Sequence, residues 1–251
     1  MIIAIDGPAA SGKSTAARAL AAQLGFVFLD TGAMYRAVTH EVLAQGLEPG
    51  DEAGCALVAG HLRFDLGQGG RLLVLSDGVE VADAALRTAE VTRNVSEVAA
   101  HSTVRRVLVA HQQGLGRRAR TVGGGVVAEG RDTTTVVFPD AEHKFFLVAS
   151  PAERARRRAL EEARRAAPGA ATDVSVAALD PAHVTEIQRD IERRDTYDST
   201  RADSPLRQHP DAVALVTDGL DAAAVVAALV EVVQPTLAGG AQTLGPGGAR
   251  A

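Results

Sequence analysis

Short apolar runs alternate with polar, glycine-containing segments at the start of the chain. The β-branched run Ile2–Ile5 ends at Asp6–Pro8, which predicts a buried strand followed by a turn. The Ala- and Leu-rich stretch Ser14–Leu24 predicts a helix that Gly25 ends, and Phe26–Leu29 predicts a second strand. A strand, a loop, a helix and a strand in this order form the opening βαβ unit of a parallel sheet that is covered on both faces.

Three later apolar runs have the length and composition of buried strands. They are Gly125–Ala128, Lys144–Ala149 and Ala212–Thr217. Together with the first two strands, they predict a sheet of five parallel strands.

Long stretches between these strands indicate additions to the sheet. Gly46–Arg120 contains a strand pair with an Asp-Gly turn in Arg71–Val81 and a helix around Val91–Gln113, which predicts an inserted subdomain. Ser150–Glu153 carries a helix-start signal, and the helix is expected to run to about residue 167. Pro168–Pro181 then separates two Arg-rich helices, which predicts a mobile lid.

Composition places the chain among ordinary globular proteins. Hydrophobic residues make up 46% of its 251 residues and charged residues 23%, which excludes wholesale disorder and a disulfide scaffold. The single Cys55 is expected to be a small buried apolar residue. The chain has no apolar run long enough to span a bilayer and no signal-peptide pattern, so we expect a cytoplasmic enzyme. The Gly-, Ala- and Pro-rich end, Pro235–Ala251, predicts a disordered tail.

The net charge of −5 and the small number of aromatic residues, two Tyr, six Phe and no Trp, argue against a nucleic-acid partner. Only Lys13 and Lys144 are lysines among the 26 Lys and Arg residues. Basic groups that act in function must therefore be mostly arginines at specific places. We expect no nucleic-acid partner and no membrane partner. We also expect the protein to be a monomer.

The loop after the first strand fits the phosphate-binding pattern G-x-x-x-x-G-K-[ST] in its required strand-to-helix context. Backbone N–H groups of such a loop and the helix N-terminus bind phosphate oxygens, Lys13 would reach the β- and γ-phosphates, and Ser14 would hold Mg²⁺. The expected ligand is ATP or GTP, bound by Gly7, Pro8, Ala9, Ala10, Ser11, Gly12, Lys13, Ser14 and Thr15. No G-x-G-x-x-G follows the strand, which disfavours a dinucleotide fold.

A loop of this kind could serve a GTPase switch, a motor ATPase or a small-molecule kinase. The base-reading motif Asn-Lys-x-Asp of a GTPase is absent from the sequence. Asp30 and Asp218 follow apolar runs, as the metal-organising Asp of a motor ATPase does. The residues after Asp30 include Thr31 and Arg36, however, and hydroxyls with an Arg suit a second phosphate better than water activation.

Transfer between two phosphates brings several negative charges together and favours bidentate guanidinium groups. Arginines recur where the expected strands end and on the helices that follow them. They are Arg36, Arg131, Arg154, Arg157, Arg158, Arg194 and Arg201.

Six sequence blocks carry a resemblance to a known family. They are GPAASGKST, LDTGAMYRA, VADAALRTAEV with VSEVAA, AEGRDTTTVVFPDA, SPAERARRR and RRDTYDSTRADSPL. In this order they resemble the bacterial cytidylate kinases of the nucleoside-monophosphate kinase superfamily, over nearly the whole chain except its tail. The resemblance implies an α/β, three-layer P-loop fold with a five-stranded parallel sheet, a monophosphate-binding insertion and a lid. The expected kinase domain is residues 1–234, with the insertion at about 37–120, the lid region at about 155–195 and the tail at 235–251.

The activity that the resemblance implies is transfer of the γ-phosphate of ATP to CMP or dCMP, with Mg²⁺ as cofactor. The implied clamps on the CMP phosphate are Arg36, Arg131 and Arg201. The implied cytosine-reading residues are Ser96, Arg105 and Asp132. Further acceptor contacts are Thr31, Tyr35, Arg87, Arg194 and Asp198, and the ATP phosphates are approached by Arg154, Arg157 and Arg158. Catalysis by charge neutralisation is assigned to Lys13, Arg131, Arg158 and Arg201.

One residue departs from the family pattern. Thr134 stands where family members usually carry Gly, which adds a side chain close to the expected acceptor site. Two other functions stay open at this point. The chain could be a P-loop kinase for another small metabolite, or a non-catalytic ATP-binding regulator.

Overall fold

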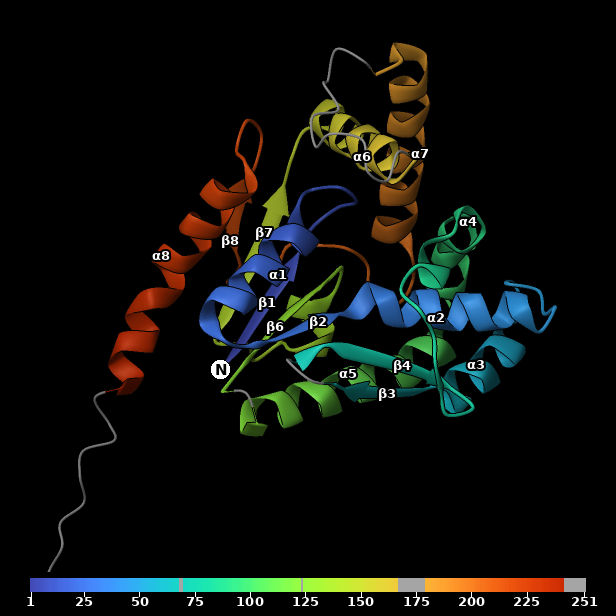
Figure 1. Cartoon of the computed structure of the whole chain (residues 1–251), viewed down its shortest axis with the longest axis horizontal. Helices are drawn as coiled ribbons and strands as arrows, with labels where there is room; N and C mark the ends of the chain where they lie inside the picture. Colours follow the sequence, from blue (N-terminus) through green and yellow to red (C-terminus); the bar gives the residue numbers. More distant parts are fainter. Residues whose placement is uncertain (68–69, 123, 167–178, 242–251) are drawn as a thin grey trace, which may run out of the picture.

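A computed structural model describes residues 1–67, 70–122, 124–166 and 179–241 (Figure 1). The main sheet has five parallel strands in the order β2-β6-β1-β7-β8. Their bounds are β1 Ile2–Asp6, β2 Val27–Asp30, β6 Val126–Gly130, β7 His143–Val148 and β8 Val213–Val216. The prediction of five parallel strands is confirmed, and every strand lies within two residues of its expected bounds.

Alternation along β1 explains the layers on the two faces of the sheet. Ile3 and Ile5 belong to a core with the helices α1 (Lys13–Leu24) and α8 (Ala222–Ala241), which lie side by side. Ile2 and Ala4 belong to the core on the other face, with α2 (Thr31–Ala44) and α5 (Ser102–Val122). Successive side chains of a strand point to opposite faces, so a run that is apolar throughout buries both faces. The expected three-layer α/β fold is confirmed.

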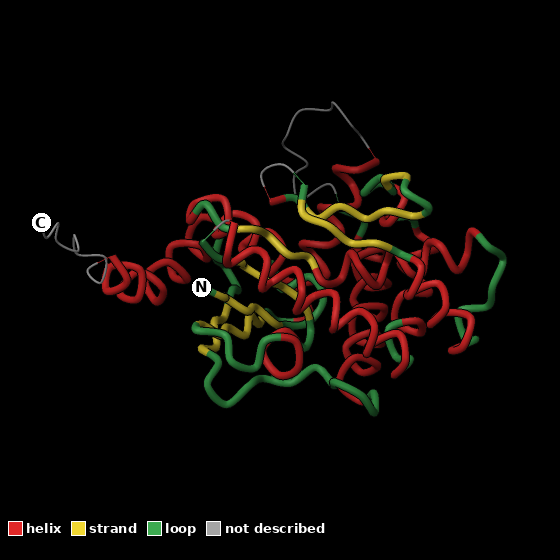
Figure 2. Tube along the Cα trace, turned by 90° about the horizontal axis from the view of Figure 1, so that it is seen from below, coloured by secondary structure: helices red, strands yellow, loops and turns green. Residues whose placement is uncertain are grey.

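The insertion carries a second, antiparallel sheet in the order β3-β4-β5, which lies beside the main sheet (Figure 2). Its elements are α3 Glu52–His61, β3 Arg63–Leu66, β4 Leu72–Ser76, β5 Val79–Glu80, η2 Ala85–Arg87 and α4 Ala89–Val98. The expected strand pair is present as β4 and β5. The sequence did not predict the third strand, because β3 has four residues and only its Phe64 is buried.

The prediction of a single helix over Val91–Gln113 is wrong. The chain forms α4 and α5 instead, which are separated at Ala99–His101. The His101 ring nitrogen Nε2 lies 2.8 Å from the Pro49 carbonyl oxygen, and Arg105 Nη1 donates to the Ala99 carbonyl oxygen at 3.0 Å. The break therefore supplies a backbone acceptor that holds Arg105, which is a contact that helical periodicity does not reveal.

The helix α6 (Pro151–Ala166) begins where its start signal predicts, and it packs on α7 (Pro181–Thr200). Most of the expected lid segment, Pro168–Pro181, lies outside the described residues, so the lid stays a prediction. The prediction of a disordered tail from Pro235 is wrong for residues 235–241, because α8 continues through that proline. Val233 is fully buried and anchors the helix just before it. Residues 242–251 lie outside the described part of the chain. Among the described residues, no helix is both long enough and apolar enough to cross a bilayer.

Candidate active site

The phosphate loop connects the end of β1 to α1 and is held in shape by two glycines. Gly7 has a φ of 154°, and a Cβ atom there would lie 2.2 Å from the carbonyl oxygen of Leu147 in β7. Gly12 precedes α1 with a φ of 88°, in the left-handed region. The loop thus needs glycine for a close backbone approach at one end and for its turn into the helix at the other. The expected strand, loop and helix are confirmed.

Lys13 and Ser14, the first two residues of α1, meet one buried carboxylate. Lys13 Nζ donates to the Pro8 carbonyl oxygen at 3.2 Å and lies 3.9 Å from Glu129 Oε2. Ser14 Oγ donates to Glu129 Oε1 at 2.7 Å. Burial, reinforced by the Arg131 guanidinium, lowers the pKa of Lys13 to about 8, while Glu129 opposes that shift. A phosphate bound beside Lys13 would therefore stabilise its charged form.

Sequence reasoning missed Glu129 as a functional residue. It ends the apolar run of β6, next to the strand that carries the phosphate loop, and is 4% exposed. Burial and Asp30 raise the pKa of Glu129, whereas Lys13 and Ser14 act against that shift. The sequence does carry a signal, because Glu129 follows an apolar strand just as Asp30 and Asp218 do.

The oxygens of Ser14 and Glu129 form a donor set that fits Mg²⁺. Magnesium prefers oxygen ligands and is usually bound by one or two protein groups together with waters and substrate phosphates. A hydroxyl and a carboxylate 2.7 Å apart beside the phosphate loop match that requirement. Within the described residues, no cluster of three or more His, Cys, Asp or Glu side chains could hold a metal without the substrate.

Two arginines of α6 contact the backbone of the phosphate loop. Arg154 Nη1 donates to the Ala9 carbonyl oxygen at 3.1 Å and pairs with Asp195 of α7, which also accepts from the Ala9 N–H at 3.2 Å. Arg157 Nη1 donates to the Ser11 carbonyl oxygen at 3.2 Å and to Thr217 Oγ1 at 2.9 Å. Both side chains therefore lie beside the phosphate loop, and their contact with the ATP phosphates stays a prediction.

Arg158 has a different set of partners. Its Nε donates to Glu162 at 2.9 Å and its Nη1 to Glu161 at 3.1 Å, both on its own helix. Its charge still contributes to lowering the pKa values of Arg36 and Arg194. Its assignment to catalysis stays a prediction.

Three guanidinium groups converge on one carboxylate at the end of α7. Arg131 Nε donates to Asp198 Oδ2 at 2.9 Å, Arg194 Nε lies 4.0 Å from the same oxygen, and Arg201 Nη1 lies 3.8 Å from Oδ1. We call these four residues the Asp198 cluster. Its formal charge is +2, because one carboxylate faces three cations.

Most of the Asp198 cluster is buried, although the Arg194 side chain is 28% exposed. Burial and Arg131 lower the pKa of Arg194 to about 10, and burial and Arg105 lower that of Arg201. Burial opposes ionisation of Asp198, but the three guanidiniums outweigh it and lower its pKa. Arg194 Nε and Arg201 Nη2 are buried with no hydrogen-bond partner in the described structure. Guanidinium donors of this kind suit a phosphate, whose oxygens accept hydrogen bonds from them.

Arg36 and Arg87 extend this basic surface from α2 and the insertion. Arg36 Nη1 donates to Thr92 Oγ1 at 3.0 Å, and burial with the charge of Arg194 lowers the pKa of Arg36 to about 9. Arg87 bridges the insertion to β2, since it pairs with Asp30 at 3.2 Å.

Arg105 and Asp132 form a buried ion pair between the insertion and the turn after β6. The Arg105 guanidinium carbon lies 5.2 Å from the ring centroid of Tyr35. Arg201 Nη2 lies 4.0 Å from the other oxygen of Asp132, so the pair adjoins the Asp198 cluster. Burial raises the pKa of Tyr35, whose hydroxyl finds no hydrogen-bond partner among the described residues.

The remaining expected site residues differ in how closely they are held. Thr31 Oγ1 donates to the Glu129 carbonyl oxygen at 2.7 Å, so it is fixed at the sheet edge. Ser96 is half-buried on α4, and Thr15 is exposed at the start of α1. Thr134 does not intrude on the acceptor side, because it is fully buried and its hydroxyl donates to Asp6 Oδ2 at 2.6 Å.

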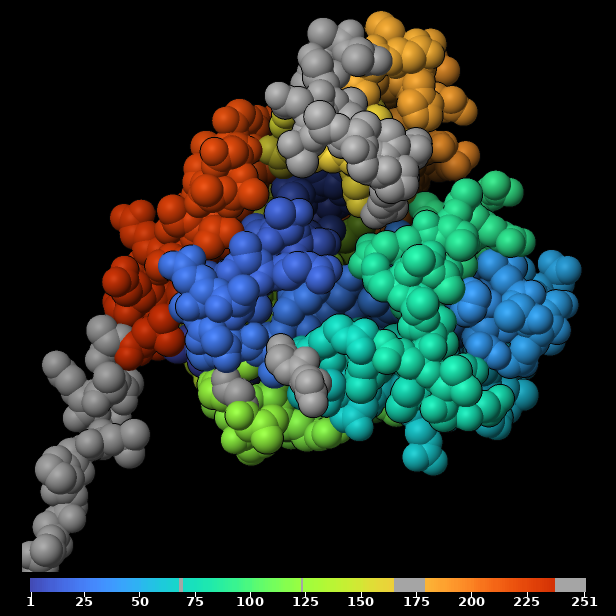
Figure 3. Space-filling view, in the orientation of Figure 1, coloured from blue at the N-terminus to red at the C-terminus, as the bar shows by residue number. Residues whose placement is uncertain are grey.

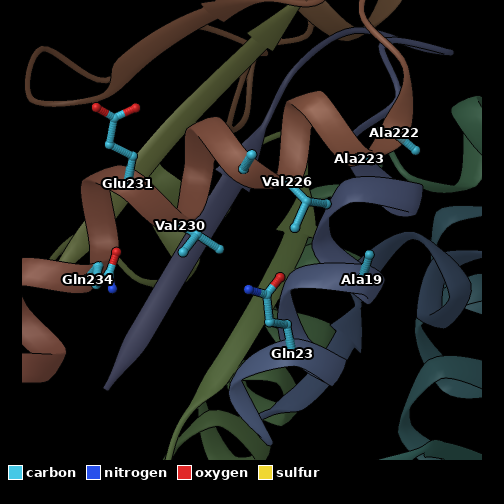
Figure 4. A pocket seen from close by; sticks show the side chains of 9 residues that line it. Ala19, Gln23, Ala222, Ala223, Val226, Val230, Glu231 and Gln234 are labelled. Carbon is cyan, nitrogen blue, oxygen red and sulfur yellow. The ribbon is translucent and has the colours of Figure 1, made fainter.

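The molecule is hollowed between the N-terminal segment and the insertion (Figure 3). This cavity of about 540 Å³ is lined by Ser14, Thr15, Arg18, Asp83, Ala84, Arg87 and Glu161. A second groove of about 470 Å³ lies between α1 and α8 and is lined mostly by Ala and Val side chains (Figure 4). Only the first adjoins the phosphate loop, so it is the one that belongs to the candidate active site.

A sequence model of the family described as cytidylate kinase matches residues 3–235. The bifunctional pantoate ligase/cytidylate kinase of Parasynechococcus marenigrum (strain WH8102) is 48% identical over 232 residues, which are 92% of this chain and 43% of that protein. The protein of the same name from Prochlorococcus marinus (strain MIT 9313) is 46% identical over 232 residues, which are 92% of this chain and 42% of its own length. The chain therefore spans less than half the length of these relatives.

A solved structure of a provisionally assigned kinase from Chloroflexus aurantiacus is 17% identical, covers 93% of this chain and 96% of its own, and has a TM-score of 0.37. The fold is defined by the strand order β2-β6-β1-β7-β8 of the main sheet. The family match over nearly the whole chain and the identity to these relatives agree with the phosphate loop and the arginine positions. This chain belongs to the cytidylate kinase family.

Proposed function

We propose that this chain transfers the γ-phosphate of ATP to CMP or dCMP, which gives ADP and CDP or dCDP. The observation that carries the proposal is the Asp198 cluster, a buried set of arginines with an excess of two positive charges, beside a phosphate loop. A single nucleotide would be served by the loop alone. A second basic site that adjoins it provides for a second phosphate, as transfer between nucleotides requires.

The base is recognised by the Arg105–Asp132 pair in this proposal. A cytosine ring offers an exocyclic amine as donor and ring atoms as acceptors. The Asp132 carboxylate can accept from the amine, and Arg105 can donate to the ring acceptors. Uracil presents a carbonyl oxygen where cytosine has its amine, so the carboxylate would face an acceptor and repel it.

The chemistry is a direct transfer. An oxygen of the acceptor phosphate forms a bond to the γ-phosphorus while the bond from the γ-phosphorus to the bridging oxygen of ADP breaks. The chain's residues position the two nucleotides and neutralise charge, and none becomes covalently attached. Lys13 reaches toward the ATP phosphates, and Arg131 and Arg201 toward the acceptor phosphate. Mg²⁺, when bound by Ser14 beside Glu129, adds positive charge at the phosphates.

The test is a product assay with the purified chain, ATP and Mg²⁺, with and without CMP or dCMP. The expected result is formation of ADP and the nucleoside diphosphate in equal amounts, with little ADP when the acceptor is omitted. A kinase for another metabolite would produce ADP only with a different acceptor. A non-catalytic ATP-binding protein would bind ATP and produce no acceptor-dependent ADP. Either result rejects the proposal.

A further inference from the structure

Asp6 is a fully buried carboxylate that none of the roles above uses. It is the last residue of β1 and directly precedes Gly7 of the phosphate loop. Its Oδ1 accepts from the Thr133 N–H at 2.9 Å and from Thr133 Oγ1 at 2.6 Å. Its Oδ2 accepts from the Thr134 N–H at 2.7 Å and from Thr134 Oγ1 at 2.6 Å. Each oxygen is thus held by one backbone and one hydroxyl donor.

These four hydrogen bonds join two segments that are far apart in the sequence. The Asp6 side begins the loop that would bind the ATP phosphates. Thr133 and Thr134 directly follow Arg131 and Asp132, which would bind the acceptor phosphate and base. The backbones also run in register there, because Asp6 pairs with Gly130 across β1 and β6. The carboxylate therefore lies where the donor and acceptor halves of the site meet.

We propose that Asp6, Thr133 and Thr134 form a clamp that fixes the acceptor-binding turn relative to the phosphate loop, and that the Thr134 hydroxyl is a positioning group for phosphoryl transfer. This inference rests on the proposed function. Asp6 acts through the segments that it joins, so it is a positioning residue. In this clamp the Thr134 hydroxyl holds Asp6, whereas the sequence suggested only that Thr134 adds a side chain close to the acceptor site.

Transfer between two bound nucleotides is sensitive to small displacements of one half of the site. A misplacement of about 1 Å can lower a rate by about 10²-fold when both reactants stay bound. Hydrogen bonds to a buried carboxylate are short and directional, so they restrict such displacements better than apolar packing does. Loss of one hydroxyl leaves part of the carboxylate without a donor and lets the turn shift.

The experiment replaces Thr134 by Val, which keeps the side-chain shape and removes the hydroxyl. Thr134→Ser is the conservative variant that keeps the donor. Thr39→Val is the matched control, because the fully buried Thr39 hydroxyl donates only to the Tyr35 carbonyl oxygen within α2, at 2.9 Å. Thr133→Val removes the matching hydroxyl from Oδ1 and provides a second test if Thr134→Val does not fold. For each variant, kcat and both KM values are measured with ATP and CMP, together with the thermal midpoint.

We expect Thr134→Val to lower kcat about tenfold while both KM values change by less than about threefold, because binding persists and alignment is lost. Thr134→Ser should keep kcat within about twofold of the parent, and Thr39→Val should do so while it lowers the thermal midpoint. If Thr134→Val retains full kcat, or if Thr39→Val loses as much, the clamp has no positioning role. A parent chain with no CMP-dependent turnover rejects the proposed function instead.

Discussion

Replacement of Asp198 by Asn tests how much the negative charge of this carboxylate stabilises the folded Asp198 cluster. The substitution keeps the shape of the side chain and removes its charge. Arg131 at 2.9 Å, Arg201 at 3.8 Å and Arg194 at 4.0 Å would then lose the carboxylate that they share, while Arg201 would keep a neighbouring acid, Asp132 at 4.0 Å. The formal charge of the Asp198 cluster rises from +2 to +3.

The expected cost is large because the carboxylate is buried. The Asp198 side chain is 6% exposed, so solvent screens its pairs only weakly. Removal of one partner of a buried ion pair typically costs about 3–5 kcal/mol, and we expect a loss of unfolding free energy in that range. The folded-state pKa of Asp198 lies below its ordinary value. Its contribution is therefore fully present above the unfolded value of about 3.9 and is lost as pH falls through the folded value.

The assay is urea unfolding without nucleotide, at pH 7 and at stepwise lower pH. The matched control is Asp190→Asn on the same helix, whose partner Arg193 is 3.0 Å away with both side chains mostly exposed. An exposed pair of this kind contributes about 0–1 kcal/mol, so the control should stay close to the parent. Equal stability of Asp198→Asn and the parent at pH 7 would refute the reasoning.

Three further predictions concern the reaction and its pH dependence. Lys13→Ala should lower kcat by about 10²-fold or more, which is the scale for loss of one preorganised donor, whereas Lys144→Ala should leave kcat unchanged. Unchanged turnover in a folded Lys13→Ala variant would reject the catalytic role of Lys13. Asp132→Ala should raise the KM for CMP more than the KM for ATP, because the carboxylate reads the base; equal increases would contradict this assignment. Since the pKa of Lys13 without nucleotide is about 8, ATP affinity in equilibrium titrations should weaken as pH rises through 8, and Lys13→Arg should remove that dependence. An affinity of the parent chain that stays flat from pH 7 to 9 would show that the Lys13 charge does not contribute.

The strongest sequence signals were those in which local pattern and tertiary environment agree. The run Ile2–Ile5 is apolar at every position because both faces of β1 are covered, so the apolar run alone predicted a buried strand. The phosphate loop was identified because Gly7 and Gly12 meet backbone requirements that other residues do not meet. Both features could be predicted without knowledge of the rest of the fold.

The errors arose where a tertiary contact overrides local pattern. The break between α4 and α5 depends on His101 beside the Pro49 carbonyl, which is distant in sequence. The helix through Pro235 persists because Val233 is anchored in the core, although the composition of that segment favours disorder. Glu129 follows an apolar run as Asp30 and Asp218 do, but its contacts with Ser14 and Lys13 are visible only in the folded structure.

The site residues implied by family resemblance are brought together to different degrees. Arg131, Arg194 and Arg201 share Asp198, and Arg105 pairs with Asp132, so these assignments have mutual geometric support. Arg158 pairs with acids of its own helix, and a local sequence pattern does not distinguish that pairing from a role at the phosphates.

The central claim is that a charged phosphate site and a cytosine-reading pair act together on one acceptor. The most direct measurement is the ratio of kcat/KM for CMP to that for UMP, with ATP saturating, in the parent chain and in Asp132→Ala. The account predicts a ratio of at least about 10² in the parent and a large decrease in the variant, because a buried acceptor must face the exocyclic amine. Equal kcat/KM values for CMP and UMP in the parent chain would contradict it.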